Sequence, residues 1–148
     1  MTFEADSAAV HAFQFSFPVI CLDACFTTCG SSSSVLLTAT FKATNGRLLT
    51  MAAGTASKET AYSWCLFLVN LRQVLIKCCS LANLDWNAVV FMSDRHSGLL
   101  SGISTHFPEC KHLYCVIHLL RNLRGLLMEE SSFWKAVQAT TKQEFDCC

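Results

Sequence analysis

Charged side chains are scarce in this sequence, and neither sign is in excess. Asp, Glu, Lys and Arg make up 15% of the 148 residues, where soluble domains average about a quarter, and 11 acidic residues balance 11 basic ones. Because 52% of the residues are hydrophobic, the composition argues against a disordered chain and is typical of a domain with a large buried fraction. The zero net charge also argues against a self-sufficient nucleic-acid-binding protein, which would carry a strong positive field.

The sequence also lacks an export signal and a membrane-spanning run. Glu4 and Asp6 stand where a secretory signal carries Lys or Arg, and no apolar run reaches about 18 residues. We therefore expect an intracellular protein that is neither secreted nor inserted in a membrane. The ten cysteines are then expected to stay reduced, rather than to form the disulfide framework of a secreted chain.

The length fits one domain, and the apolar periodicity predicts an α/β fold. Asn45-Gly46 lies between two β-rich runs and predicts an antiparallel hairpin. We expect a lead-in at 1–14, strands at 15–25, 35–42 and 48–56 with a loop at 30–34, a helix at 59–78, a strand at 87–94, a helix at 96–107, a strand at 111–117 and a helix from 118. The order β-β-β-α-β-α-β-α predicts a mixed sheet of about five strands with flanking helices.

Two aspartates stand in or after apolar strands. Asp23 lies inside the apolar run VICLDACF, where an ionised carboxylate needs a compensating partner, and Asp94 ends the run NAVVFMSD. If these strands are neighbours, the two carboxylates converge and suit Mg²⁺ or Mn²⁺, which prefer oxygen ligands. An alternative stays open, in which Asp23 caps a turn or pairs with Arg95 and Asp94 is the N-cap of the next helix.

The segment ECKHLYCVIH holds the densest cluster of soft metal ligands. Cys110, His112, Cys115 and His118 are candidates for a zinc site, although their spacing differs from that of a zinc finger. In the alternative interpretation Cys115 is a buried strand residue and His118 starts a helix. Cys21, Cys25 and Cys29 are not expected to share an ion, because four residues of strand separate successive sulfurs by about 13 Å.

Other side chains of the sequence suggest weaker sites. Any of the ten cysteines and five histidines can be combined into a protease-like pair, and nothing in the sequence selects one. The basic residues after the second acid are candidates for contacts with phosphates or, alternatively, form a solvated helix face; they are Arg95, Lys111, Arg121 and Arg124.

Taken in order, these motifs resemble the transposase domain of Mutator-like transposable elements. DACF is similar to the family's Asp-Gly-Thr-Phe, VLLTAT and ATNGRLLTMAAGTA to its following strands, and Glu59 to Trp64 to the start of its long helix. The passage SDRHSGLLSGISTHFPECKHLYCVIHLLRN matches the family's Ser-Asp-Arg, Phe-Pro and His-x2-Cys-x2-His-x3-Asn motifs almost completely. The similarity runs from about Pro18 to Asn122.

The resemblance implies an RNase H-like core at 15–128 and DDE-type chemistry, in which three acids hold two Mg²⁺ or Mn²⁺ ions for attack on DNA phosphodiesters. By position Asp23 is the first acid and Asp94 the second, while Cys115 and His118 match the Cys-x2-His signature. The family's third acid is a glutamate further downstream, which we expect beyond Cys148. Three nearby acids do not match that glutamate, namely Glu129, Glu130 and Glu144.

Residues 129–148 are then expected to begin a helical insertion that the chain truncates. The resemblance further implies a nuclear protein that binds transposon ends, with a homo-oligomer as a candidate assembly. Two alternatives remain: a non-catalytic, domesticated remnant that binds DNA or a protein partner, and a small zinc-stabilised module.

Overall fold

The computed structural model describes residues 1–29, 32–78, 84–123 and 129–143, in two compact units, Met1–Leu113 and Tyr114–Cys148. The first unit has the element order β1 (Thr2–Ala5), α1 (Ser7–Phe13), β2 (Val19–Cys29), β3 (Ser32–Lys42), β4 (Leu48–Ala56), α2 (Ala61–Cys78), β5 (Val90–Ser93) and α3 (Ser97–His106). β6 (Lys111–Tyr114) crosses the boundary, and α4 (Val116–Leu123) and α5 (Glu130–Gln138) follow it.

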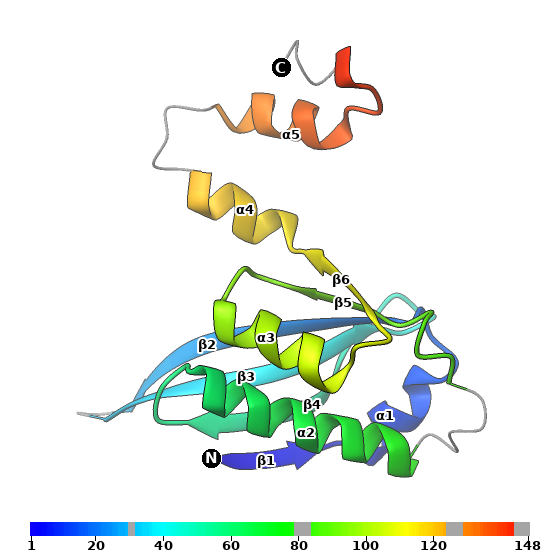
Figure 1. Ribbon diagram of the computed structural model, residues 1–148, viewed down its shortest axis with the longest axis vertical. Helices are drawn as coiled ribbons and strands as arrows, with labels where there is room; N and C mark the ends of the chain where they lie inside the picture. The colour runs from blue at the N-terminus through cyan, green and yellow to red at the C-terminus, as the bar shows by residue number, and fades with distance from the viewer. Residues whose placement is uncertain (30–31, 79–83, 124–128, 144–148) are drawn as a thin grey trace. The chain divides into compact units, whose positions relative to one another are not determined.

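The strands form a mixed six-stranded sheet in the order β1-β4-β3-β2-β5-β6 (Figure 1). β3 pairs antiparallel with both β2 and β4, and β5 pairs parallel with β2. The Asn45-Gly46 turn is confirmed: Gly46 has φ +83°, a conformation that glycine adopts without strain, and Asn45 Oδ1 accepts the Arg47 N–H at 3.0 Å. A mixed α/β fold with flanking helices is therefore confirmed.

The main core lies on one face of the sheet. α2 buries Trp64, Phe67, Leu68, Leu71 and Leu75, as its helical spacing predicts, and α2 and α3 lie side by side over the strands (Figure 1). Alternate residues of the strands face these helices; on β2 and β3 they include Ile20, Leu22, Leu37, Ala39 and Phe41. The intervening residues of β2, Cys21, Asp23 and Cys25, therefore point to the other face of the sheet.

Residues 1–14, which were expected to be a lead-in, form part of the folded first unit. β1 pairs with β4 and adds a sixth strand at the edge, and α1 buries Ala9, Val10 and Phe13 in the core cluster. Asp6 Oδ1 accepts the N–H groups of Ala8 and Ala9 and caps α1.

Several predicted boundaries of strands were wrong. The first long strand ends at Cys29 instead of Cys25, and the strand expected from Asn87 begins only at Val90, because the N–H groups of Ala88 and Val89 donate to Asp85 O and Trp86 O in a turn. The first long strand begins at Val19 instead of Phe15, because Phe15 and Ser16 continue the turn after α1 through bonds to Ala12 O and Phe13 O. The predicted loop at 30–34 is shorter, since β3 already begins at Ser32; Gly30 and Ser31 lie outside the described residues. The last strand ends at Tyr114, because α4 begins at Val116.

The described part of the second unit, from Tyr114, contains α4 and α5. Its two helices are short, and the buried side chains among its described residues are Leu120 on α4 and Phe133 on α5. None of the helices in the described part of the whole chain is long and apolar enough to cross a membrane.

Candidate metal site at the ends of two parallel strands

The register of β2 and β5 relates the two candidate acids. Val19 pairs with Val90, Ile20 with Phe91 and Cys21 with Met92, so the strands run parallel and in step. Asp23 and Asp94 each stand two residues beyond the last of these pairs. Since side chains alternate between faces with a period of two, this register carries both carboxylates to the same face, where neighbouring strands are about 4.8 Å apart. The condition set by the sequence, that the two strands are neighbours, is therefore met, while the shared metal site stays a prediction.

Asp23 lies within β2 and opposite Thr38 of β3. Its Oδ1 accepts the N–H of Ala24 at 2.9 Å, and the Thr38 hydroxyl donates to its backbone carbonyl at 3.3 Å. The side chain is exposed, because the apolar run around it buries only its alternate residues. The expectation that Asp23 sits in a buried environment was therefore wrong.

Asp94 follows directly after β5 and is half-buried. Its Oδ1 accepts the backbone N–H of His96 at 3.0 Å, a turn that holds the carboxylate at the end of the strand. The N-cap of α3 is His96, whose Nδ1 accepts the N–H of Leu99 at 3.4 Å, so the alternative in which Asp94 caps the helix was wrong. Asp94 is thus positioned by the connection between β5 and α3.

A further carboxylate, Glu59, lies beside this connection. Its Oε1 accepts the indole N–H of fully buried Trp64 at 3.0 Å and lies 3.9 Å from His96 Nδ1. The same nitrogen cannot accept from Leu99 and also donate to Glu59. The contact with the Leu99 N–H is the shorter of the two, so we take Nδ1 as the acceptor, and the proton of the neutral ring is then on Nε2. The spacing of Glu59 and Trp64 is the signal in the sequence that could have identified this contact, yet neither residue was among the predicted site residues.

The Cys and His candidates divide between the two units. Cys110 and His112 lie in the first unit, and Cys115 and His118 in the second. His112 Nε2 lies 2.9 Å from the hydroxyl of buried Ser93, and burial lowers the pKa of its imidazole. Burial, assisted by the Glu109 charge, raises the pKa of Cys110 to about 11. A zinc site built on these residues stays a prediction.

Among the described residues, no group of three or more His, Cys, Asp or Glu side chains gathers closely enough to hold a metal ion. In the described part of the chain, the candidate metal site therefore consists of two acids, Asp23 and Asp94, on neighbouring strands. The proposed phosphate contacts are scattered: Arg95 and Lys111 are exposed in the first unit, Arg121 is exposed on α4, and Arg124 lies outside the described residues.

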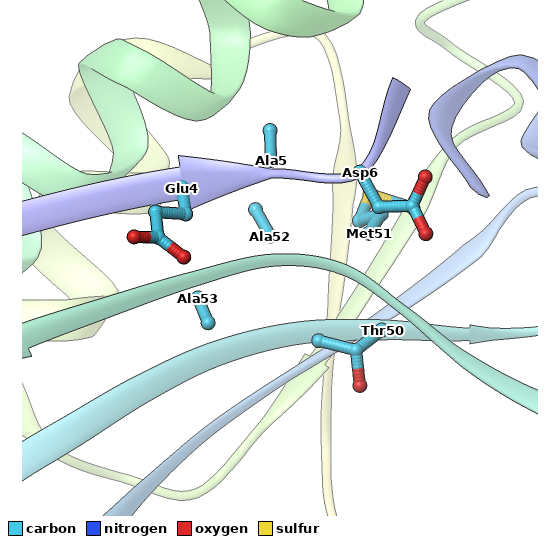
Figure 2. A pocket seen from close by; sticks show the side chains of 7 residues that line it. All are labelled: Glu4, Ala5, Asp6, Thr50, Met51, Ala52 and Ala53. Atoms are coloured by element: carbon cyan, nitrogen blue, oxygen red, sulfur yellow. The ribbon is translucent and has the colours of Figure 1, made fainter. Parts of the chain in front are cut away.

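A hollow in the described structure lies elsewhere, between β1 and β4. It has a volume of about 270 Å³ and is lined by Glu4, Ala5, Asp6 and residues 50–53 (Figure 2). β3 and β2 separate this edge of the sheet from β5, so the hollow is distinct from the site of the two acids.

Comparison with known proteins identifies the family. A search of curated proteins gives no match. Among solved structures, the chain is similar to a chain in the cryoEM structure of the simian T-cell lymphotropic virus intasome in complex with PP2A regulatory subunit B56 gamma. The identity is 10% and the TM-score 0.46, over 90% of this chain and 47% of that one, so the protein spans about half of its length. The family model described as MULE transposase domain matches residues 19–122. The chain therefore belongs to the MULE transposase domain family.

Proposed function

We propose that the first unit is an RNase H-like core. Three consecutive antiparallel strands, β2 to β4, are followed by α2 and then by β5, which pairs parallel with the central strand β2. β6 follows α3 and takes the next place in the sheet. The sheet order β4-β3-β2-β5-β6 and the helices between the later strands support this assignment.

On this core, we propose that Asp23 and Asp94 hold divalent cations for DNA strand cleavage and transfer. The observation that supports the proposal best is the parallel register of β2 and β5, which relates the two acids across neighbouring strands. Hard ions such as Mg²⁺ and Mn²⁺ prefer carboxylate oxygens and retain open positions for water and phosphate. Two such ions about 4 Å apart would activate the attacking oxygen and stabilise the leaving oxygen at a phosphodiester.

A complete DDE site needs a third acid. In this proposal it is a glutamate downstream of Cys115 and His118, and Asp23 and Asp94 supply the other two. In this proposal the substrate is DNA at transposon ends, the site of action is the nucleus, and the basic residues near the acids, such as Arg95, contact phosphates.

Mn²⁺ titration followed by electron paramagnetic resonance tests the metal site. We expect the wild-type protein to bind Mn²⁺, and both Asp23→Asn and Asp94→Asn to weaken its affinity by at least about tenfold, because each removes an anionic oxygen ligand. Asp85→Asn is the matched control: Asp85 is an exposed aspartate that accepts the N–H of Asn87, away from this strand end. The control should bind as the wild type does.

Equal Mn²⁺ affinity in the wild type and both variants would contradict the metal site. A wild type that binds DNA but no Mn²⁺ would instead favour the non-catalytic alternative. In a longer chain that includes the downstream glutamate, either Asn substitution should abolish DNA nicking while DNA binding persists, because the family chemistry needs both acids.

A further inference from the structure

Cys65 and His106 form a close pair that the two-acid site does not use. Cys65 lies on α2 and His106 is the last residue of α3, and the distance from Sγ to Nε2 is 3.2 Å. Both side chains are half-buried at the contact between the two helices. A thiol at this distance can donate its proton to the imidazole, which is the arrangement of a nucleophile with an adjacent base.

The position of His106 is held by neighbouring residues. Arg72, on α2, donates from Nη1 to the carbonyl oxygen of His106 at 2.7 Å and forms an ion pair with Glu109 at 3.1 Å. The guanidinium carbon of Arg72 lies 4.8 Å from the centroid of the Trp86 ring and 5.3 Å from that of Phe107. These contacts hold the C-terminal end of α3 against α2, and they thereby position the imidazole of His106 beside the thiol of Cys65.

Two other cysteines offer internal comparisons. Cys25 is exposed on β2, and its thiol donates only weakly to the carbonyl of Phe26 at 3.8 Å. Cys110 is half-buried, and burial raises its pKa to about 11, which disfavours the thiolate. Exposure alone would make Cys25 the fastest of the three to react, whereas an adjacent base would favour Cys65.

We propose that Cys65 is a site of thiol–disulfide exchange with small disulfides and that His106 is its proton acceptor. His106 Nε2 takes the proton from the thiol, and the thiolate attacks one sulfur of the disulfide. A new bond forms between Cys65 Sγ and that sulfur, the original S–S bond breaks, and the leaving thiolate takes the proton from the imidazolium. Cys65 is oxidised to a mixed disulfide and the small molecule is reduced to a thiol.

The setting of Cys65 defines the reagent class. Because Sγ is half-buried between two packed helices, compact neutral disulfides can reach it more easily than bulky ones. The product would place an extra group between α2 and α3, the helix that begins beside Asp94. This site is independent of the two carboxylates and of the proposed metal chemistry.

The test is exchange with bis(2-hydroxyethyl) disulfide at neutral pH, quenched with acid and followed at each cysteine by peptide mass spectrometry. In the wild type we expect Cys65 to react severalfold faster than Cys25, and Cys110 to react slowest. In His106→Gln, the rate at Cys65 should fall severalfold while Cys25 is unchanged, because glutamine can accept a hydrogen bond but does not take up the proton. His11→Gln, at an exposed histidine on α1, is the matched control and should leave all rates as in the wild type.

A wild-type protein in which Cys65 reacts more slowly than Cys25 would overturn the proposal. So would a folded His106→Gln variant in which Cys65 keeps its rate. If circular dichroism shows that this variant is unfolded, the relative exchange rates of Cys65, Cys25 and Cys110 in the wild-type protein test the proposal alone, because that measurement needs no substitution.

Discussion

Replacement of Gly98 by alanine should destabilise the protein at the point where α3 begins. A Cβ atom at Gly98 would lie 2.6 Å from the Cα and 2.8 Å from the N of Ala61, the first residue of α2. Carbon atoms in good contact are about 3.5–4 Å apart, so the two helix starts would have to separate by roughly 1 Å. Because the obstacle is backbone, no rotamer change can relieve it.

The magnitude follows from two opposing terms. Overpacking of a core contact costs about 1–3 kcal/mol, and alanine in place of glycine in a helix returns at most about 1 kcal/mol. The difference is a loss of about 0–2 kcal/mol, and since the obstacle is backbone that cannot move aside, we expect Gly98→Ala to lower the free energy of unfolding by about 1–2 kcal/mol. Gly102→Ala is the matched comparison, because its Cβ would meet Leu68 Cδ1 at 2.6 Å, the end of a flexible side chain. A rotamer shift there costs about 1 kcal/mol and is offset by the gain in helix propensity.

Urea unfolding followed by circular dichroism measures both changes. The same Gly98→Ala protein should bind Mn²⁺ more weakly, because α3 and the turn at His96 position the carboxylate of Asp94. The reasoning is refuted if Gly98→Ala is as stable as the wild type, or if Gly102→Ala loses more stability than Gly98→Ala does.

Three further predictions concern other parts of the first unit. Leu71→Ala should lower the unfolding free energy in urea by about 2–5 kcal/mol, because Leu71 is fully buried on α2; a loss below about 1 kcal/mol would contradict the packing. Arg72→Ala should cost more stability in the same assay than Glu109→Ala, because Arg72 also holds a backbone carbonyl and packs on two aromatic rings, whereas its partner is exposed; the reverse order would count against this network. Burial lowers the pKa of His112, so the unfolded chain binds a proton more readily: the contribution of the neutral ring is complete above about pH 6.5 and declines as the pH falls through that value, and His112→Gln should flatten this part of the stability profile. An unchanged pH profile in His112→Gln would contradict this linkage between the burial of the ring and stability.

Local patterns in the sequence predicted the elements that depend on local signals. The three- and four-residue spacing from Trp64 to Leu75 predicted the buried face of α2, and Asn45-Gly46 predicted the hairpin between β3 and β4. These predictions succeeded because helix amphipathicity and turn geometry are properties of neighbouring residues.

The errors arose where distant contacts decide the outcome. β1 has only four residues and becomes a strand by pairing with β4, about fifty residues away, which its own sequence does not reveal. Asp23 was expected to be buried because VICLDACF is apolar, but only one face of β2 is covered by the helices of the first unit. Composition along a strand does not state which of its faces a distant helix will cover.

The sequence by itself determined the family resemblance, the order of the main elements and the two aspartates as candidates. Only the tertiary structure decided that β2 and β5 pair in a register that relates Asp23 to Asp94, and that Cys65 meets His106 across a separation of 41 residues. Periodicity is encoded in neighbouring residues, whereas the pairing of strands and the packing of helices depend on the shape and burial of the whole sheet. The two aspartates and the cysteine are visible in the sequence, but only the fold shows which residues lie beside them.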